Sequence, residues 1–430
     1  MPEHTRPSRR GRTTLARHGQ LRTRHPLTEV LIMLAAVVGV IVASATGVAA
    51  FTVWDAATAL SAASVVLDED EVLPPSLGAI EGGVDVLIAG TDSCEGQDVK
   101  IFPRCKNNDS PGERNDVTML VHITDNPRRV TVVSFPRDML VPIPACDKPG
   151  GGQTQAMSSQ MINVSYWYGG LACTAKTVEA LTGEKIDFAA AIRWTGVINM
   201  SDAIGGVDVC VAGDISDVHT GLNLTKGAHT LVGAEALQFL RMRHGIGDGS
   251  DLGRISNQQQ FMSSMVRKLQ SESVLANPGT LLNFATTALS QVNQGQLVLS
   301  SGLTNPSLMV QIAMALKDVP YEDIVFVQYP TEYASGEGAS RVLPVRDAAD
   351  ALFAALRANQ PITLTGEASQ GYGVEVEGEA TAPVTTPSAT PDAAPTPGAT
   401  VAPTPEERVE LPHDIAGTTA AQVTCTRPEG

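Results

Sequence analysis

The stretch VTMLVHITDNPRRVTVVSFP, residues 117–136, determines the expected fold. It contains two runs of apolar, mostly β-branched residues, 117–124 and 129–136, and each run predicts a buried strand. Only the residues DNPR, 125–128, lie between the two runs. So short a connection predicts a hairpin, and therefore two antiparallel neighbours within one sheet.

Similar apolar runs alternate with helical segments along the rest of the chain. VDVLIAG (84–90) and IVFVQYP (324–330) predict two further buried strands. Apolar residues at helical spacing predict helices at 173–181, 232–241, 255–269, 279–289 and 348–356. The interleaved order predicts an α/β domain with helices on both faces of a central sheet, and the hairpin makes that sheet mixed.

The beginning of the chain predicts a membrane anchor. Residues 1–29 contain seven arginines and two glutamates, whereas residues 30–54 contain no charged side chain. About 20 apolar residues span a bilayer as a helix, and basic residues stay on the cytoplasmic side. We therefore expect a single-pass protein of the cell membrane, with a cytoplasmic tail (1–29), a transmembrane helix (30–54) and an extracellular domain. The alternative is a cleaved signal peptide, because ASATGVAA (43–50) resembles a cleavage site.

Composition divides the remainder of the chain into three parts. Residues 55–80 predict a stalk, and residues 81–364 predict one globular domain of about 280 residues. Residues 365–430 are rich in Pro, Thr and Ala and predict a disordered tail, whose last segment (409–430) is too short to fold alone. The net charge is −16 overall and +5 for residues 1–29, so residues 30–430 carry −21. Such an acidic region disfavours binding to nucleic acid.

All six cysteines follow the apolar run, and none of them forms a CxxC pair. A zinc site is therefore weakly supported, whereas an even number of cysteines in an exported region favours disulfides. Six cysteines allow fifteen pairings. The pairs favoured by loop context and nearness in sequence, and for the last pair by elimination, are Cys94–Cys105, Cys146–Cys173 and Cys210–Cys425.

Charged residues gather at the ends of the predicted strands and around a glycine-rich loop, HGIGDGSDLG (244–253). Binding sites of α/β proteins often form at strand ends, where loops from distant parts of the chain meet. Asp92 also fits an ordinary turn residue. The charged and amide positions concerned are Asp92, Arg114, Asp116, Arg137, Asp138, Arg241, Arg243, Asp248, Asp251, Arg254 and Gln258.

Several of these positions also have a purely structural interpretation. Arg114 and Asp116 could form a solvated ion pair, and Asp251 could cap the helix that starts near residue 252. Arg254 and Gln258 could share an exposed helix face. Together, however, the set combines arginines with carboxylates and contains no obvious nucleophile–base pair.

That combination suits phosphoryl transfer. Arginine holds phosphate oxygens with a planar fork of donors, and carboxylates hold Mg²⁺, which bridges phosphate oxygens. The reaction requires a positioned phosphate, balanced charge and an oriented hydroxyl group. Glycines in the loop allow the backbone to approach such a group, and the start of the following helix favours an anion.

Six motif segments follow one another behind the apolar run. They are VDVLIAGTDS (84–93), RNDVTMLVHIT (114–124), VTVVSFPRDMLVPIP (130–144), INVSYWYGG (162–170), TGVINMSDAIGGVDVCV (195–211), and ALQFLRMRH (236–244) followed by DLGRISNQQQF (251–261). No segment is decisive alone, but their order behind a single N-terminal anchor is highly specific. This order resembles the LytR–CpsA–Psr family of cell-wall phosphotransferases, and the GDGSDLGRISNQQ form resembles its actinobacterial members.

The resemblance implies an enzyme that binds a polyprenyl-pyrophosphate-linked glycan, transfers the glycan phosphate to a hydroxyl of peptidoglycan and releases polyprenyl phosphate. It implies Asp92 and Asp116 as ligands of Mg²⁺ (or Mn²⁺). It also implies that Asp251 orients Arg254 or assists the acceptor, and that the lipid enters an apolar pocket between sheet and helices. The residues implied around the pyrophosphate are Arg114, Arg137, Arg241, Arg243, Arg254 and Gln258.

Three positions depart from the family pattern. Cys94 and Asn257 stand where arginine is frequent, and Met161 stands where lysine is frequent. These departures lower the predicted positive charge and favour, as one alternative, a non-catalytic lipid- or glycan-binding wall protein. A pyrophosphatase that uses water as the acceptor is a second alternative. A transcriptional regulator is disfavoured, because the sequence has no helix-turn-helix or zinc module and the acidic domain is expected outside the cell.

Overall fold

The structure is a computed structural model that describes residues 64–67, 83–107, 112–271, 278–304, 306–336, 340–380 and 408–430. All of them belong to one compact unit, residues 57–430. The predicted cytoplasmic tail, the predicted anchor at 30–54 and most of the predicted stalk lie outside the described residues. Within the described ranges, no helix has both the length and the apolar character that crossing a bilayer requires.

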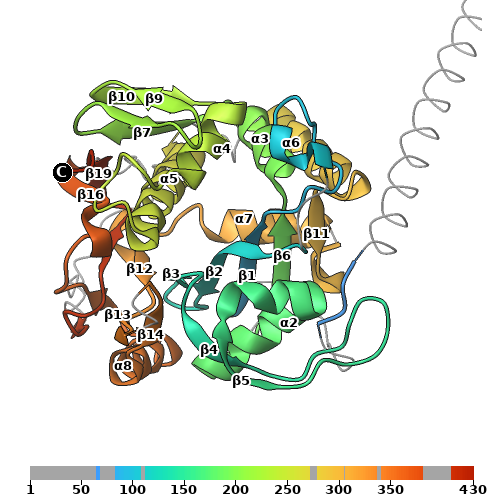
Figure 1. The fold of residues 1–430 in the computed structure, drawn as a ribbon. Coiled ribbons are helices and arrows are strands. Elements are labelled where there is room, and N and C mark those ends of the chain that lie inside the picture. The colour runs from blue at the N-terminus through green and yellow to red at the C-terminus, as the bar shows by residue number, and fades with distance from the viewer. Residues whose placement is uncertain are drawn as a thin grey trace, which may run out of the picture. The chain divides into compact units, whose positions relative to one another are not determined.

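A mixed seven-stranded sheet forms the centre of this unit (Figure 1). The hairpin predicted from residues 117–136 is confirmed, with Leu120 opposite Val133 on antiparallel β2 and β3. Pairing is parallel between β1 and β6 and between β3 and β12, so the sheet is mixed as expected. The strand order is β11 (Leu297–Leu299), β6 (Phe188–Ile192), β1 (Val84–Thr91), β2 (Asn115–Ile123), β3 (Val130–Ser134), β12 (Ile324–Gln328) and β18 (Gly417–Thr419).

Each of the five predicted helices is present in the structure. They are α2 (Ser165–Thr182), α4 (Gly233–Arg241), α5 (Asp251–Ser271), α6 (Pro278–Asn293) and α8 (Arg346–Arg357). Two further helices, α3 (Trp194–Ala203) and α7 (Pro306–Ala315), were not predicted. Short two-stranded ribbons are made by β4 (Leu140–Ile143) with β5 (Met157–Met161), β8 (Ile215–Asp217) with β9 (Leu222–Leu224), β13 (Thr331–Tyr333) with β14 (Val342–Pro344), and β15 (Ile362–Thr363) with β17 (Val409–Glu410).

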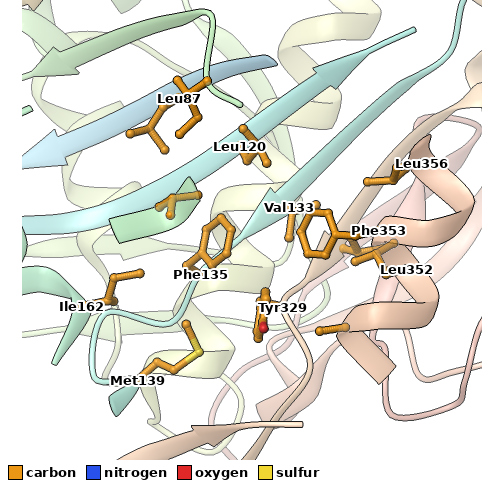
Figure 2. Packing of buried hydrophobic residues seen from close by; sticks show 14 of the residues in the cluster. Leu87, Leu120, Val133, Phe135, Met139, Ile162, Tyr329, Leu352, Phe353 and Leu356 are labelled. Atoms are coloured by element: carbon orange, nitrogen blue, oxygen red, sulfur yellow. The ribbon is translucent and has the colours of Figure 1, made fainter. Parts of the chain in front are cut away.

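Successive strand residues pack on opposite faces of the sheet, as the two-residue period of a strand requires. Leu120 and Val133 belong to the core on the side of α2 and α8, where Val133 lies near Phe353 (Figure 2). Met119 and Val132 belong to the core on the side of α5, α6 and α7. Helices therefore cover both faces. Burying each of these side chains stabilises the fold by about 1.5–3 kcal/mol.

The prediction that residues 365–430 are disordered is wrong for residues 365–380 and 408–430, which form strands and turns of the domain. Residues 381–407 lie outside the described part. β16 (Val374–Glu379) and β19 (Gln422–Thr426) join β7 (Val207–Val211) and β10 (Gly227–Leu231) in a second sheet, while β18 extends the central sheet. Residues 409–430 have no core of their own, but they bury apolar side chains in the domain. Those side chains are Leu411, Ile415, Ala416 and Ala420.

All three favoured disulfides are present, Cys94–Cys105, Cys146–Cys173 and Cys210–Cys425. The third bond joins residues 215 positions apart and fastens β19 to β7. It explains how a short terminal segment with little apolar character stays on the domain.

Candidate active site

A cavity of about 380 Å³ lies between the central sheet and helices α3 to α6. Its wall is mainly apolar and includes four methionines, Met119, Met200, Met262 and Met265, whose flexible side chains adapt to irregular apolar ligands. Further apolar lining residues are Ile88, Val117, Ile192, Val197, Ile204, Leu237, Leu240, Phe261 and Phe284. The cavity therefore has the position, between sheet and helices, that was expected for a lipid pocket.

Six of the nine predicted site residues line this same cavity. They come from three separate parts of the chain, the beginning of β2, the turn after β3, and α4 with the following loop and α5. They are Asp116, Arg137, Arg241, Arg243, Arg254 and Gln258. The interpretation of Arg254 and Gln258 as exposed helix neighbours is wrong, because their exposed fractions are 5% and 3%.

Asp251 completes the cluster through its contacts with the arginines. Its Oδ1 lies 2.8 Å from Nη2 of Arg254, 3.2 Å from Nε of Arg137 and 3.9 Å from Nε of Arg243. The helix is capped by Ser250 instead, whose Oγ accepts a hydrogen bond of 3.3 Å from N of Gly253. The interpretation of Asp251 as a cap is therefore wrong, and its carboxylate faces the guanidinium groups.

Asp116 is the second carboxylate of the cluster. Nη1 of Arg137 donates a 2.9 Å hydrogen bond to its Oδ1, and Nη2 of Arg254 donates a 2.8 Å bond to its backbone oxygen. Burial alone would raise the pKa of Asp116, but the charges of Arg137 and Arg254 outweigh burial and lower this pKa below its ordinary value. Asp116 is therefore ionised at neutral pH, and it is not the solvated partner of Arg114.

Several buried polar atoms of the cluster have no hydrogen-bond partner among the described residues. They are Nε of Arg137, Arg243 and Arg254 and both carboxylate oxygens of Asp251, although ion pairs surround them. Burial lowers the pKa of Arg254, although the charge of Asp251 opposes this effect. Buried donors without a hydrogen-bond acceptor are costly, so an anion that accepts from them would stabilise the site. The residues present therefore fit a phosphate-containing ligand.

Arg241 and Trp194 form a contact that the sequence did not predict. The guanidinium of Arg241 lies over the indole of Trp194, 4.5 Å from the ring centroid, and both line the cavity. Trp194 also packs on Phe102, next to the Cys94–Cys105 disulfide. The disulfide formed by Cys94 thus supports Trp194, the residue on which Arg241 stacks. A helix at residues 194–203 was not predicted from the sequence. Recognising the start of this helix would have been the signal that points to Trp194 as a site residue.

Asp92 and Arg114 lie beside the cavity but are not among the residues that line it. N of Arg114 donates a 2.9 Å hydrogen bond to Oδ1 of Asp92, at the ends of β1 and β2 where Thr91 pairs with Asn115. The guanidinium of Arg114 lies over Trp167, 5.6 Å from its ring centroid. Asp92 and Arg114 therefore lie near Asp116, but the guanidinium of Arg114 contacts Trp167 and not the arginine cluster.

Asp92 and Asp116 suit Mg²⁺ in the presence of a phosphate ligand. The described ranges contain no group of three or more His, Cys, Asp or Glu side chains placed to hold a metal ion. Mg²⁺, however, is commonly bound by one or two carboxylates together with phosphate oxygens and water. Two carboxylates at adjacent strand ends are consistent with that donor set.

The family departure at Asn257 does not reduce the charge of the site. Asn257 is fully buried and faces away from the cavity, since its Nδ2 donates a 2.9 Å hydrogen bond to O of Phe239 and its Oδ1 accepts one from the hydroxyl of Thr426. At the third departure, Met161 contacts Arg341, whose Nη1 lies 3.3 Å from Oδ1 of Asp138. A guanidinium thus lies beside the position where lysine is frequent.

The α/β domain thus contains an apolar cavity that ends in a cluster of arginines and carboxylates. Residues 57–358 match the model of the LytR_cpsA_psr family, and the chain belongs to that family. The match ends before the segments that form β16 to β19.

Curated relatives come from several bacteria. The chain is 26% identical over 283 residues to the cell wall biosynthesis protein LcpA of Corynebacterium glutamicum, covering 60% of this chain and 52% of that protein. It is 32% identical over 169 residues to the polyisoprenyl-teichoic acid–peptidoglycan teichoic acid transferase TagU of Bacillus mycoides, covering 39% of this chain and 51% of that protein. The chain thus spans about half the length of these relatives. A solved LytR-Csp2A-Psr enzyme from Actinomyces oris is 22% identical, with a TM-score of 0.49 over 68% of this chain and 95% of that one.

Proposed function

We propose that this protein transfers a phosphate-linked glycan from a polyprenyl-pyrophosphate carrier to a hydroxyl group of peptidoglycan. The observation that carries the proposal is the cavity whose apolar wall meets a cluster of four arginines and Asp116. Such a cavity suits a ligand with a long hydrocarbon chain and a diphosphate head.

The arginine cluster would bind the diphosphate and balance its charge during the reaction. Nε of Arg137, Arg243 and Arg254 have no hydrogen-bond acceptor among the described residues, and phosphate oxygens are strong acceptors. Phosphoryl transfer depends mainly on positioning and on charge stabilisation. Asp251 would position these arginines, because one of its oxygens lies within 4 Å of all three.

Asp116, with Asp92 beside it, would hold Mg²⁺ (or Mn²⁺), which would neutralise the negative charge of the phosphate groups. The lowered pKa of Asp116 keeps its carboxylate available for this at neutral pH. In the transfer itself, the acceptor oxygen forms a bond to the phosphorus of the glycan phosphate. The bond from that phosphorus to the bridging oxygen breaks, polyprenyl phosphate leaves, and the hydroxyl proton is released.

The relatives support the proposed class of substrates. TagU of Bacillus mycoides is named for the transfer of polyisoprenyl-linked teichoic acid to peptidoglycan, and LcpA of Corynebacterium glutamicum is named for cell wall biosynthesis. We therefore propose a polyprenyl-linked cell-wall polymer as the donor. The apolar run at residues 30–54 supports a membrane-anchored enzyme that acts outside the cell.

The proposal is tested with full-length protein, a labelled polyprenyl-pyrophosphoryl glycan and peptidoglycan, with Mg²⁺ or with EDTA. We expect Mg²⁺-dependent transfer by the wild type and a loss of at least about 100-fold in Arg254→Ala. Arg128→Ala is the matched control, because Arg128 lies in the turn after β2, away from the cavity, and forms an ion pair with Asp125, 3.5 Å away. Labelled glycan phosphate released into water would indicate the pyrophosphatase. Donor binding without turnover would indicate the non-catalytic alternative.

A further inference from the structure

Residues near the end of the sequence hold the loop that carries Arg243 and Asp251. N of Gly247 donates a 3.1 Å hydrogen bond to O of Arg427, and N of Glu429 donates one of 3.1 Å to O of Gly245. In return, N of Gly245 donates a 2.8 Å bond to Oε2 of Glu429. Glu429 thus pairs with Gly245 through both its backbone and its side chain.

These residues are themselves fastened to the domain on two sides. Cys425 is bonded to Cys210 of β7, and O of Thr426 accepts a 2.8 Å hydrogen bond from N of Ala212. The hydroxyl of Thr426 contacts the amides of Asn257 and Gln260 in α5. Residues 425–429 therefore link the rigid β7 and α5 to the loop between α4 and α5.

A third segment, residues 370–373, contacts both the loop and residues 425–429. N of Asp248 donates a 3.0 Å hydrogen bond to O of Gly371, and N of Arg427 donates one of 3.0 Å to O of Gly373. At Gly247, which has a φ of +54°, a Cβ atom would lie 2.3 Å from O of Gly371. No side chain fits there, so glycine is required where the loop and this segment meet.

We propose that residues 425–429 are a positioning element for the arginine site, and that Glu429 is its positioning residue toward Gly245. This inference rests on the proposed function. The element follows the residues that match the family, 57–358, so it is a device of this chain's own C-terminal region. It sets the path of residues 244–250, and therefore the separation of Arg243 from Asp251 at the two ends of that loop.

The alternative is that the contacts only add stability to the domain. Positioning and stability make different predictions, because a displacement of about 1 Å in a reacting group costs about 100-fold in rate without unfolding the protein. Glu429 is exposed, so its side chain contributes little to the core. A loss of rate at unchanged melting temperature would therefore indicate positioning.

Three variants of Glu429 remove its contacts step by step in the full-length protein. Glu429→Gln keeps an acceptor oxygen for Gly245, Glu429→Ala removes that acceptor, and Glu429→Pro also removes the N–H that donates to Gly245. We expect kcat for donor cleavage to be near the wild-type value in Glu429→Gln, about 10-fold lower in Glu429→Ala and lower again in Glu429→Pro. Arg427→Ala is the control, since its bond to the loop is made by its backbone and its side chain pairs with Glu375.

Amide hydrogen exchange of residues 244–250 gives a readout that does not depend on turnover. We expect faster exchange at Gly245 and Gly247 in Glu429→Ala and Glu429→Pro, with an unchanged melting temperature and weaker binding of geranylgeranyl pyrophosphate. Wild-type rate and probe affinity in Glu429→Pro would overturn the inference. If the wild type had no transferase activity but the probe affinity still fell in this order, the proposed function would fail while the positioning element would stand.

Discussion

Oδ1 of Asp251 lies 2.8 Å from Nη2 of Arg254, three residues further along the first turn of α5. The same oxygen faces Arg137 and Arg243, so one carboxylate stands between three guanidinium groups that would otherwise repel one another. This arrangement keeps several cations close together in the absence of a ligand. Their Nε atoms are buried and have no hydrogen-bond acceptor among the described residues.

Asp251→Asn should lower both activity and stability. The substitution keeps the shape of the side chain but leaves the buried Arg254 without its closest anion, which costs about 3 kcal/mol. We expect kcat/KM for donor cleavage to fall about 100-fold, because the arginines lose their relative positions. Asp323→Asn is the control, since it removes an ion pair with Arg408 away from the cavity. Equal effects of the two substitutions on cleavage would contradict the assigned role.

The ion pair of Asp116 predicts a specific dependence of stability on pH. Its pKa is lowered in the folded protein, so its contribution is fully present above the unfolded pKa of about 3.9 and is lost as the pH falls through the lower folded value. The difference in unfolding free energy between wild type and Asp116→Asn should therefore be constant from about pH 5 to 8 and shrink in stronger acid. Chemical denaturation across this range measures it, and a difference that changes near neutrality would refute the assignment.

A larger side chain in the cavity should weaken the binding of long-chain lipids. Val197 of α3 lines the apolar wall, and Val197→Trp would occupy much of the space that a prenyl chain needs. We expect affinity for a long-chain polyprenyl pyrophosphate to fall at least about 10-fold, while inorganic pyrophosphate binds as before. Calorimetric titration with a series of chain lengths measures this, and the inorganic ligand serves as the internal control. Equal losses for every chain length would place the lipid elsewhere.

Replacing Asn257 with the arginine that is frequent in the family should destabilise the folded protein. Asn257 has no exposed surface, and both ends of its amide are hydrogen-bonded, to Phe239 and to Thr426. An arginine there would bury an unpaired charge against β19, and we expect the unfolding free energy to fall by about 3 kcal/mol without a gain in donor affinity. Thermal denaturation and titration with donor measure both. Tighter donor binding by a stable Asn257→Arg variant would be inconsistent with the structure.

His122 should stabilise the fold most at acidic to neutral pH. Burial would lower its pKa, but the 2.9 Å hydrogen bond and charge of Asp85 raise it above the ordinary value. A raised folded pKa gives stability that is fully present below the unfolded pKa of about 6.5 and is lost as the pH rises through the folded value. The difference in unfolding free energy between wild type and His122→Gln should thus be larger at pH 6 than at pH 9. An equal difference at both values would rule out this contribution.

The sequence predicted those parts of the fold that depend on local patterns. The hairpin of β2 and β3 follows from two β-branched runs around DNPR, and α5 follows from a stripe of apolar residues beginning at Ile255. The gathering of Asp116, Arg137 and Arg254 was expected because strand ends and adjoining loops share one edge of a sheet. These signals lie within short segments and need no knowledge of the partners they meet.

Features that depend on a distant partner could not be predicted. Asn257 and Gln258 are neighbours in α5, yet they point in different directions because successive helical residues are turned by about 100°. Gln258 lines the cavity and Asn257 meets Thr426, and only the position of β19 decides this. Ile415 is likewise buried in the core, although the polar, proline-rich sequence before it does not indicate a buried segment.

Transfer of the glycan phosphate to peptidoglycan is tested by following both products of one turnover in full-length protein. Donor labelled in the glycan phosphate is mixed with peptidoglycan and Mg²⁺, and released polyprenyl phosphate and labelled peptidoglycan are measured together. We expect equal amounts of the two products in the wild type and neither product above background in Arg254→Ala. Polyprenyl phosphate without labelled peptidoglycan, or transfer that survives the loss of Arg254, would contradict the proposed function.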